Sequence, residues 1–489
     1  MQLTGRQMPF GPSRRHTNPW RVLVYLVLIM AGVIFTRMVE SQRVQRPFVP
    51  TPTPTRVVLS YVEEAQTYFS VGDLESTIEA YRKALEVDPE NARLYAEMAR
   101  VQTYSSELRT NSTERQARMA EARASIDRGT ELTPDDSMVQ AVRSLVYDWS
   151  AFAIDDAEVR LSFLTEAETA AVYAKQLDPA NVLADAYYAE VLVDQRKWAQ
   201  AMDVAEQTVE AAESRNDISD LMRLDIYRVY AVVLENNGYY YGAIDAYLKA
   251  LEYAPSLTFL YLNLGTNYRQ LKLENPEYLE MALDSFARAA QINEQLGIED
   301  PVPYLAIGKT YMQEGEFFAA ALNISKALQF DSTDPDIYGR LGLVYFKARN
   351  YESSLDVLQC AVQGCDAEVN RSVLCEALYG CDPEDPEALQ YGEEITGLIL
   401  DSNSVVYYYT YASALAYYGM CDEAEVLFRD LNSVYPNDAI VQAIIAENRA
   451  ICSDAEVAGD ETAAGVVEPT ESAVPAETEI LTPTATPSP

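Results

Sequence analysis

Six cysteines are the residues whose type and spacing most directly allow chemistry. All lie in the last third of the sequence: Cys360, Cys365, Cys375, Cys381, Cys421 and Cys452. An even, clustered set is typical of disulfides formed in an oxidising compartment. Zinc binding is the alternative, but intervals of four, nine and five residues separate the first four cysteines, unlike the CxxC pairs of zinc ribbons. We therefore expect disulfides and no metal site, with reduced core thiols as the remaining interpretation.

Catalytic chemistry has little support in the sequence. The single histidine, His16, precedes an apolar segment, so the rest of the chain has no imidazole for a triad or a proton shuttle. A P-loop, a GxGxxG unit and a GxSxG elbow are also missing where an enzyme would need them. Acidic residues are spread throughout, and no carboxylate pair stands out. We predict a protein that is not an enzyme and uses no cofactor.

Charge divides the sequence into a basic head and an acidic body. The chain has 37 basic and 75 acidic residues, a formal charge of -38. Residues 1–56 contain eight arginines and one acid, a net +7, so residues 57–489 carry -45. A body this acidic argues against binding to nucleic acid.

An apolar run from Val22 to Phe35 indicates a membrane segment. The run alone spans about 21 Å, and flanking Trp20, Arg21 and Arg37 would extend it toward the roughly 30 Å hydrocarbon core. We predict a transmembrane signal anchor at 20–39; a cleaved signal peptide is the alternative, although no small-x-small cleavage site follows. The Thr/Pro stretches FVPTPTPTR and LTPTATPSP resemble spacers of cell-surface proteins, glycosylated or simply stiff. They favour an extracytoplasmic body, on the cell surface or periplasmic side.

From residue 57 to 452 the sequence repeats a pattern of small and aromatic residues. In the first unit these are Tyr61, Ala65, Tyr68, Gly72, Tyr81, Ala84 and Pro89. Their spacing places apolar residues on one face of two successive helices, with a turn at Gly72 and a helix end before Pro89. The pattern returns at 227–255 and 304–327. It resembles the tetratricopeptide repeat (TPR) family, whose unit is a 34-residue helix-turn-helix.

The resemblance implies an all-α fold: a right-handed α-solenoid of stacked helix-turn-helix repeats, preceded by one transmembrane helix. We expect a basic segment at 1–19, the anchor at 20–39, a Thr/Pro linker at 40–56, and about nine to ten helical pairs plus a capping helix at 57–452. The segment 360–397 departs most from the pattern and is interpreted as a degenerate helical pair. Residues 453–489 form an acidic Thr/Pro-rich tail with too little apolar content to fold.

Stacking also predicts one disulfide. In such an array the end of the capping helix approaches the preceding inter-helix turn, which pairs Cys452 with Cys421. The other four cysteines allow three connectivities, of which Cys360–Cys365 and Cys375–Cys381 are the local choice.

By similarity to the family, residues of the first helix of each pair line the inner wall of the solenoid. The polar and cationic residues on or near that wall are Asn263, Asn267, Arg269, Gln270, Lys309, Gln313, Arg340 and Lys347. Against an acidic body, the cations could receive a carboxylate or an acidic peptide, or simply pair with surface acids. We predict a membrane-anchored scaffold or adaptor for a protein or peptide partner; the alternative is a non-catalytic accessory subunit of an envelope secretion or surface-polymer assembly complex.

Overall fold

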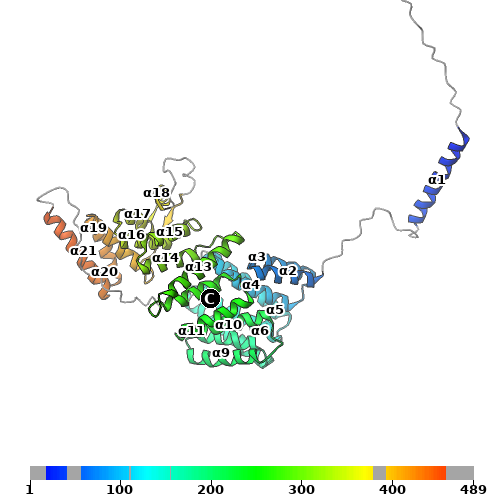
Figure 1. Cartoon of the computed structure of the whole chain (residues 1–489), viewed down its shortest axis with the longest axis horizontal. Coiled ribbons are helices and arrows are strands. Elements are labelled where there is room, and N and C mark those ends of the chain that lie inside the picture. Colours follow the sequence, from blue (N-terminus) through cyan, green and yellow to red (C-terminus); the bar gives the residue numbers. More distant parts are fainter. Residues whose placement is uncertain (1–17, 41–56, 110–111, 155, 378–391, 459–489) are drawn as a thin grey trace, which may run out of the picture. The chain divides into compact units, whose positions relative to one another are not determined.

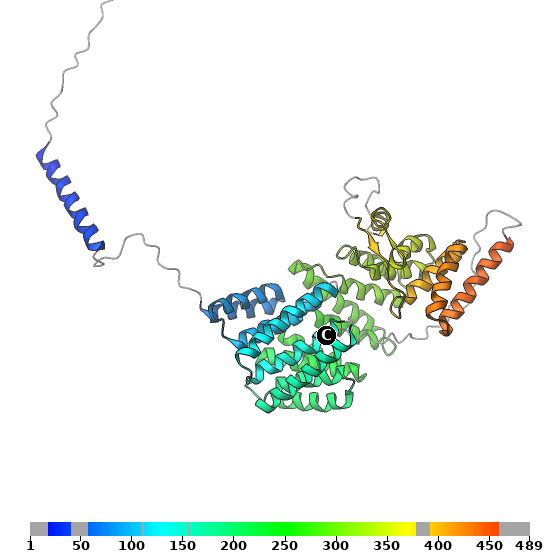
Figure 2. The same cartoon turned by 180° about the vertical axis from the view of Figure 1, so that it is seen from behind.

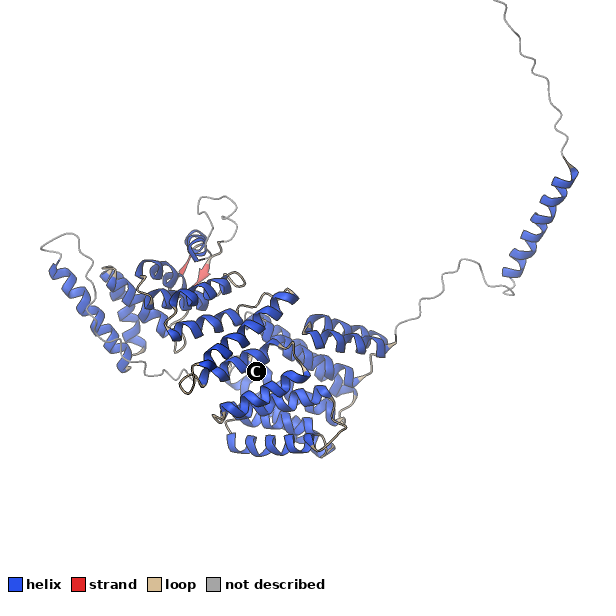
Figure 3. Cartoon of the chain, viewed as in Figure 1, coloured by secondary structure: helices blue, strands red, loops and turns tan. Residues whose placement is uncertain are grey.

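The computed structural model of the chain describes residues 18–40, 57–109, 112–154, 156–377 and 392–458. The chain divides into two units, residues 1–56 and residues 57–489, which are treated separately here. The described parts are helical except for one short pair of strands (Figure 3).

The described residues of the first unit, 18–40, contain one helix, α1 (Pro19–Glu40). Its 22 residues span about 33 Å, enough for a hydrocarbon core of roughly 30 Å, because the helix continues on both sides of the apolar run. Its side chains from Trp20 to Ile34 are exposed. This helix is long and apolar enough to cross a membrane, and a signal sequence near the N-terminus has the same character.

The second unit is a row of antiparallel helical hairpins, which lie side by side in Figures 1 and 2. The first five pairs are α2 (Val58–Val71) with α3 (Leu74–Val87), α4 (Ala92–Ser105) with α5 (Ser112–Leu132), α6 (Ser137–Phe152) with α7 (Ala157–Leu177), α8 (Val182–Asp194) with α9 (Trp198–Glu213), and α10 (Asp220–Asn236) with α11 (Tyr240–Tyr253). A short 3-10 helix, η1 (Ser106–Leu108), follows α4.

The later pairs are α12 (Thr258–Gln270) with α13 (Glu277–Leu296), α14 (Val302–Glu314) with α15 (Phe317–Leu328), α16 (Pro335–Lys347) with α17 (Tyr351–Val362), and α19 (Val405–Tyr417) with α20 (Cys421–Val434). Helix α18 (Ala367–Ala377) lies between the last two pairs, and α21 (Ala439–Ala458) follows them. Strands β1 (Gly364–Cys365) and β2 (Ile395–Thr396) pair antiparallel, with Gly364 opposite Thr396.

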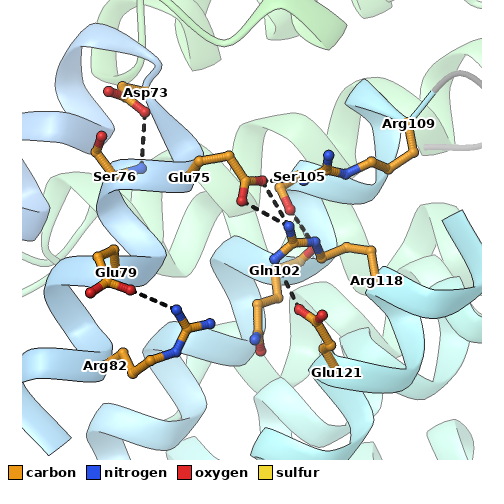
Figure 4. Close-up of polar contacts among 10 residues, drawn as sticks. All are labelled: Asp73, Glu75, Ser76, Glu79, Arg82, Gln102, Ser105, Arg109, Arg118 and Glu121. Carbon is orange, nitrogen blue, oxygen red and sulfur yellow. Dashed lines mark hydrogen bonds and ion pairs between the residues drawn. The ribbon is translucent and has the colours of Figure 1, made fainter. Parts of the chain in front are cut away.

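Turn chemistry explains why each hairpin forms. Gly72 ends α2 with a φ of 85°, and the Asp73 side chain then accepts the backbone N–H of Ser76 to cap α3 (Figure 4). Glycine has no Cβ and enters this left-handed region without strain. Gly315 closes α14 in the same way, whereas Arg196 takes the corresponding position after α8 with a φ of 60°.

Small residues allow the two helices of a hairpin to pack closely. A Cβ added to Gly265 of α12 would lie 2.5 Å from the Phe286 ring of α13, and one on Gly342 of α16 would lie 2.5 Å from Leu358 of α17. Neighbouring hairpins are also tied together by polar contacts: Glu75 of α3 accepts hydrogen bonds from Arg109 and from Arg118 of α5 (Figure 4). The repeat pattern thus encodes both the pair and its stacking.

First helices form the inner wall of the array. Helix α4 contacts α6, α6 contacts α8, and α8 contacts α10, while each second helix lies against the first helix that follows it. One buried apolar core runs from Ala65 to Leu271 and a second from Ala282 to Ile445. In the N-terminal part the array also closes on itself: a Cβ on Gly72 would lie 2.5 Å from the backbone oxygen of Ser256.

Candidate functional site

The inner wall of the N-terminal hairpins carries buried arginines that are paired with buried acids. Arg100 of α4 donates to Asp225 of α10 at 2.9 Å, and the hydroxyl of Tyr187 donates to the same carboxylate at 3.0 Å. Arg228 of α10 donates two hydrogen bonds to Glu190 of α8, one of them at 2.7 Å. These groups are at most 3% exposed. In the N-terminal hairpins, these side chains of the inner wall therefore belong to the buried core.

This network also sets unusual protonation states. Burial acts to lower the pKa of Arg228, but Glu190, Tyr104 and Asp225 together outweigh burial, and the pKa is raised well above its usual range. Beside the network, burial together with Asp194 and Glu190 raises the pKa of Asp148 well above normal, and burial together with Glu190 raises the pKa of Asp194 to about 8. The two arginines are therefore already balanced by acids and hold no spare positive charge.

The inner wall of the later hairpins is different, because its cations gather with few acids. Arg269 of α12, Lys309 of α14 and Arg340 of α16, here called the cationic cluster, come from three successive first helices. Arg269 lies 3.5 Å from the hydroxyl of Thr310 and its guanidinium lies 5.5 Å from the centre of the Phe286 ring. Arg340 is the one member with an ion pair among the described residues, to Asp336 at 2.6 Å.

Burial and repulsion lower the pKa of two members of the cluster, whereas burial of Arg340 is outweighed by Asp336 and its neighbours, which raise the pKa of Arg340. Burial, reinforced by Arg269, Arg340 and Lys272, lowers the pKa of Lys309 to about 8. Burial and Arg340 lower the pKa of Arg269 to about 10. Each of the three side chains is half-buried and keeps access to solvent. The cluster therefore resembles an anion site, in which an added negative charge would relieve the repulsion.

Acids also face the cluster and reduce its charge. Asp336 accepts from Arg340 and from the hydroxyl of Tyr407 in α19, at 2.7 Å for the latter. Burial raises the pKa of Asp334 to about 6. Tyr407 is a contact that the sequence did not predict, because it reaches α16 from a helix some 70 residues later. Even so, Arg269 and Lys309 have no ion pair among the residues that the structure describes.

The remaining residues predicted for this wall fall into two groups. Asn263 and Asn267 are buried, at 6% and 2% exposure, and the Asn267 amide donates to Glu235 at 2.6 Å, so both belong to the core here. Gln270, Gln313 and Lys347 are exposed. The candidate surface thus consists of the cationic cluster with exposed polar residues around it.

A hollow of about 740 Å³ lies elsewhere, where the turns before α6, α8 and α10 meet. Its arginines are occupied: Arg93 pairs with Asp136 at 2.8 Å, and Arg215 pairs with Asp217 at 2.8 Å. This hollow therefore offers no free positive charge.

The structure joins Cys421 to Cys452, which fastens α21 to the start of α20, and it joins Cys360 to Cys365 beside β1. Cys375 is also disulfide-bonded. The predicted partner Cys381 lies outside the described residues. Within the described parts of the chain, no group of three His, Cys, Asp or Glu side chains is arranged to hold a metal ion.

Comparisons with known proteins agree with the hairpin architecture. A family profile described as "TPR repeat" matches residues 65–102, which run from α2 to α4. No curated protein sequence matches the chain.

Several solved structures are similar at low sequence identity. The APC/C hetero-tetramer Cut9–Hcn1 matches at 13% identity and a TM-score of 0.45, covering 68% of this chain, which spans 54% of the matched chain. A human IFIT1 dimer crystallised with PPP-AAAA matches at 15% identity and a TM-score of 0.45, covering 83% of this chain and 84% of that one. A TPR protein of Thermus thermophilus matches at 16% identity and a TM-score of 0.34, covering 43% and 98%. Residues 65–102 of the present chain are thus similar to a tetratricopeptide repeat, and they lie in an all-α solenoid of hairpins built in the same way.

Proposed function

We propose that this protein is a membrane-anchored scaffold that recruits a protein partner by binding an acidic segment at the cationic cluster. The observation that supports this most is the gathering of Arg269, Lys309 and Arg340 on one wall. Within the described residues, Arg340 is the one member of this cluster that forms an ion pair. A stacked helical array presents an extended surface on which such a segment can lie, and acidic motifs are commonly bound by clustered cations.

Energetics support a ligand at this place. Residues 57–489 carry a net charge of -45, so acids are abundant and any surface cation could have been paired. Many other cations are paired, as Lys326 with Glu294 at 2.7 Å shows, and the described cations without an ion pair include exposed ones such as Arg288 and Lys347. Arg269 and Lys309 differ from those two in being half-buried beside one another. Holding like charges together costs free energy, which a bound carboxylate would recover through charge-assisted hydrogen bonds of about 1.5–3 kcal/mol each.

We further propose that α1 anchors the body to a membrane and that the body lies on the extracytoplasmic side. The length of α1 and its exposed apolar side chains support an anchor, and the paired cysteines support an oxidising compartment. Extraction at alkaline pH tests the anchor: an anchored chain stays with the membrane pellet and keeps its N-terminal residues by mass spectrometry. Release of a shorter chain would instead show a cleaved signal peptide.

Photo-crosslinking in cells of the source organism tests the scaffold function. A photoreactive residue replaces Gln313, which is exposed on α14 near the cluster, or Arg288, which is exposed on the second helix α13 and serves as the control. We expect the Gln313 position to capture a protein that the Arg288 position does not, through a peptide rich in Asp and Glu. Changing Arg269, Lys309 and Arg340 to Gln should abolish this capture. Unchanged capture would contradict the proposal.

A further inference from the structure

We propose that the acidic C-terminal tail of the chain, residues 459–489, occupies the cationic cluster and must be displaced before a partner can bind. This inference rests on the proposed function, because it uses the same site, and it adds regulation by a segment of the chain itself. It is carried by three observations: the charge complementarity of the cluster and the tail, the place where the tail begins, and the spacing of two acids in the tail.

Charge complementarity is the first argument. The tail contains no basic residue and six acids: Asp460, Glu461, Glu468, Glu471, Glu477 and Glu479. The body that precedes it is strongly acidic, so most of its surface repels the tail. In the cluster, burial and neighbouring cations lower the pKa of Lys309 and of Arg269, so an incoming carboxylate is favourable beside these two residues.

Position is the second argument. The tail follows α21, which packs on α19, and α19 contacts α16 directly through Tyr407 and Asp336. Helix α19 is therefore the one first helix that lies between α21, which precedes the tail, and α16, which carries Arg340. With about 10 Å between packed helices, the cluster begins roughly 20 Å from α21. A chain of 31 residues can span at most about 100 Å, so the tail is long enough to reach all three cations, of which Arg269 is the furthest from α21.

Spacing is the third argument. Arg269 and Arg340 both act on the charge of Lys309, so the three cations lie near one another. Glu468 and Glu471 are three positions apart in the sequence, so their carboxylates can lie within about 10 Å of each other. The tail can therefore bring two carboxylates to neighbouring cations at once.

Amine reactivity of Lys309 measures whether the tail is bound. Tail carboxylates should raise its pKa, and a rise of one unit from about 8 would leave about fivefold less reactive free amine at pH 8. We compare the full chain, a chain ending at Ala458, and a full chain with E468Q and E471Q, each in detergent. Labelling of Lys309 with an amine-reactive ester should be about fivefold faster in the truncated chain and intermediate in the double variant.

Lys326 is the internal control, because it is paired with Glu294 on the outer helix α15 and should label equally in all three proteins. Equal Lys309 rates in the full and truncated chains would overturn the inference. Carbodiimide cross-linking of mixed isotope-labelled and unlabelled chains then identifies the occupant. Links from Lys309 to tail glutamates within one chain support the inference; links only between differently labelled chains overturn it in favour of a second copy.

An octaglutamate peptide separates failure of this inference from failure of the proposed function. If the tail has no effect but octaglutamate slows Lys309 labelling equally in the full and truncated chains, the site binds acidic segments and the tail is not its ligand. If octaglutamate protects Lys309 in neither chain, both proposals fail. If it protects the truncated chain at a lower concentration than the full chain, the tail competes as proposed.

Discussion

Lys309 is the residue on which binding at the proposed site should depend most. Its amine has a pKa lowered to about 8 by burial and by neighbouring cations, so it is mostly protonated at pH 7 and mostly neutral at pH 9. A bound anion prefers the protonated form, so binding must weaken as the pH rises through this pKa.

We therefore expect the affinity of the chain ending at Ala458 for octaglutamate to fall about tenfold between pH 7 and pH 9. Substitution of Lys309 by Arg keeps the positive charge but moves its titration out of this range. The Lys309→Arg variant should bind with little change over the same interval. Fluorescence anisotropy with a labelled peptide measures both; an equal pH dependence in the two proteins would assign the effect to other groups.

Arg228 illustrates the opposite case of a residue that acts in stability. It lies 1% exposed between Glu190 and Asp225, so its removal leaves buried carboxylates without a counter-charge. We expect Arg228→Met to lower the free energy of unfolding by about 3–5 kcal/mol. Lys326→Met removes an exposed ion pair and should cost less than about 1 kcal/mol. Denaturant titration distinguishes them; equal small losses would mean that the buried network is dispensable.

The sequence analysis named the cations of the cluster, because the type of a residue and its position in the repeat unit can be read from the sequence alone. It did not predict the buried network, because Arg100 and Asp225 are 125 residues apart and come together only through the curvature of the array. For the same reason it placed Asn263 and Asn267 on the open wall, whereas the structure buries them.

At the scale of elements, hairpins with a clear repeat pattern were predictable and the irregular segment was not. Gly72 and Pro89 mark the turn and the end of the first pair, and α2 and α3 end at these places. Between Cys360 and Gly397 the described residues contain α18 and the strands β1 and β2. Two-residue strands have no periodic signal, so the sequence could not have indicated them.

The Cys421–Cys452 disulfide should stabilise the last element. It closes a loop of 31 residues and joins α21 to the beginning of α20. Loop-closure entropy gives about 3–4 kcal/mol for such a link. We expect C421S together with C452S to expose α21 amides to hydrogen exchange while α4 to α10 remain protected. Unchanged exchange in α21 would show that packing on α19 alone holds the capping helix.

At the scale of the whole body, the N-terminal hairpins form a closed turn. Gly72 lies against the backbone of Ser256 from the turn between α11 and α12, and a Cβ there would lie 2.5 Å from a backbone oxygen. Gly238 has a similar φ of 79° but nothing within 4 Å of an added Cβ. Substitution by alanine would strain the backbone at both positions, but only at Gly72 would the new Cβ also meet another part of the chain.

We expect Gly72→Ala to destabilise the body by about 1–3 kcal/mol more than Gly238→Ala, because only the first substitution forces the closed turn apart. Thermal unfolding of both variants measures the difference. Equal losses would show that the contact between these distant hairpins contributes nothing beyond the strain of the turn.

In the N-terminal hairpins the arginines of the inner wall are buried and paired with acids. The first helices of the later hairpins instead carry Arg269 and Lys309, which have no ion pair among the described residues, and we propose that acidic segments bind there. The most direct measurement is octaglutamate binding to the chain ending at Ala458 at about 0.1 M salt. Changing Arg269, Lys309 and Arg340 to Gln should weaken binding by at least about tenfold. The same change at Lys249, Arg288 and Lys326, on second helices, alters the net charge equally and should leave binding nearly intact. Equal loss in both triple variants, or no binding by the parent chain, would contradict a specific acidic-segment site on the inner wall.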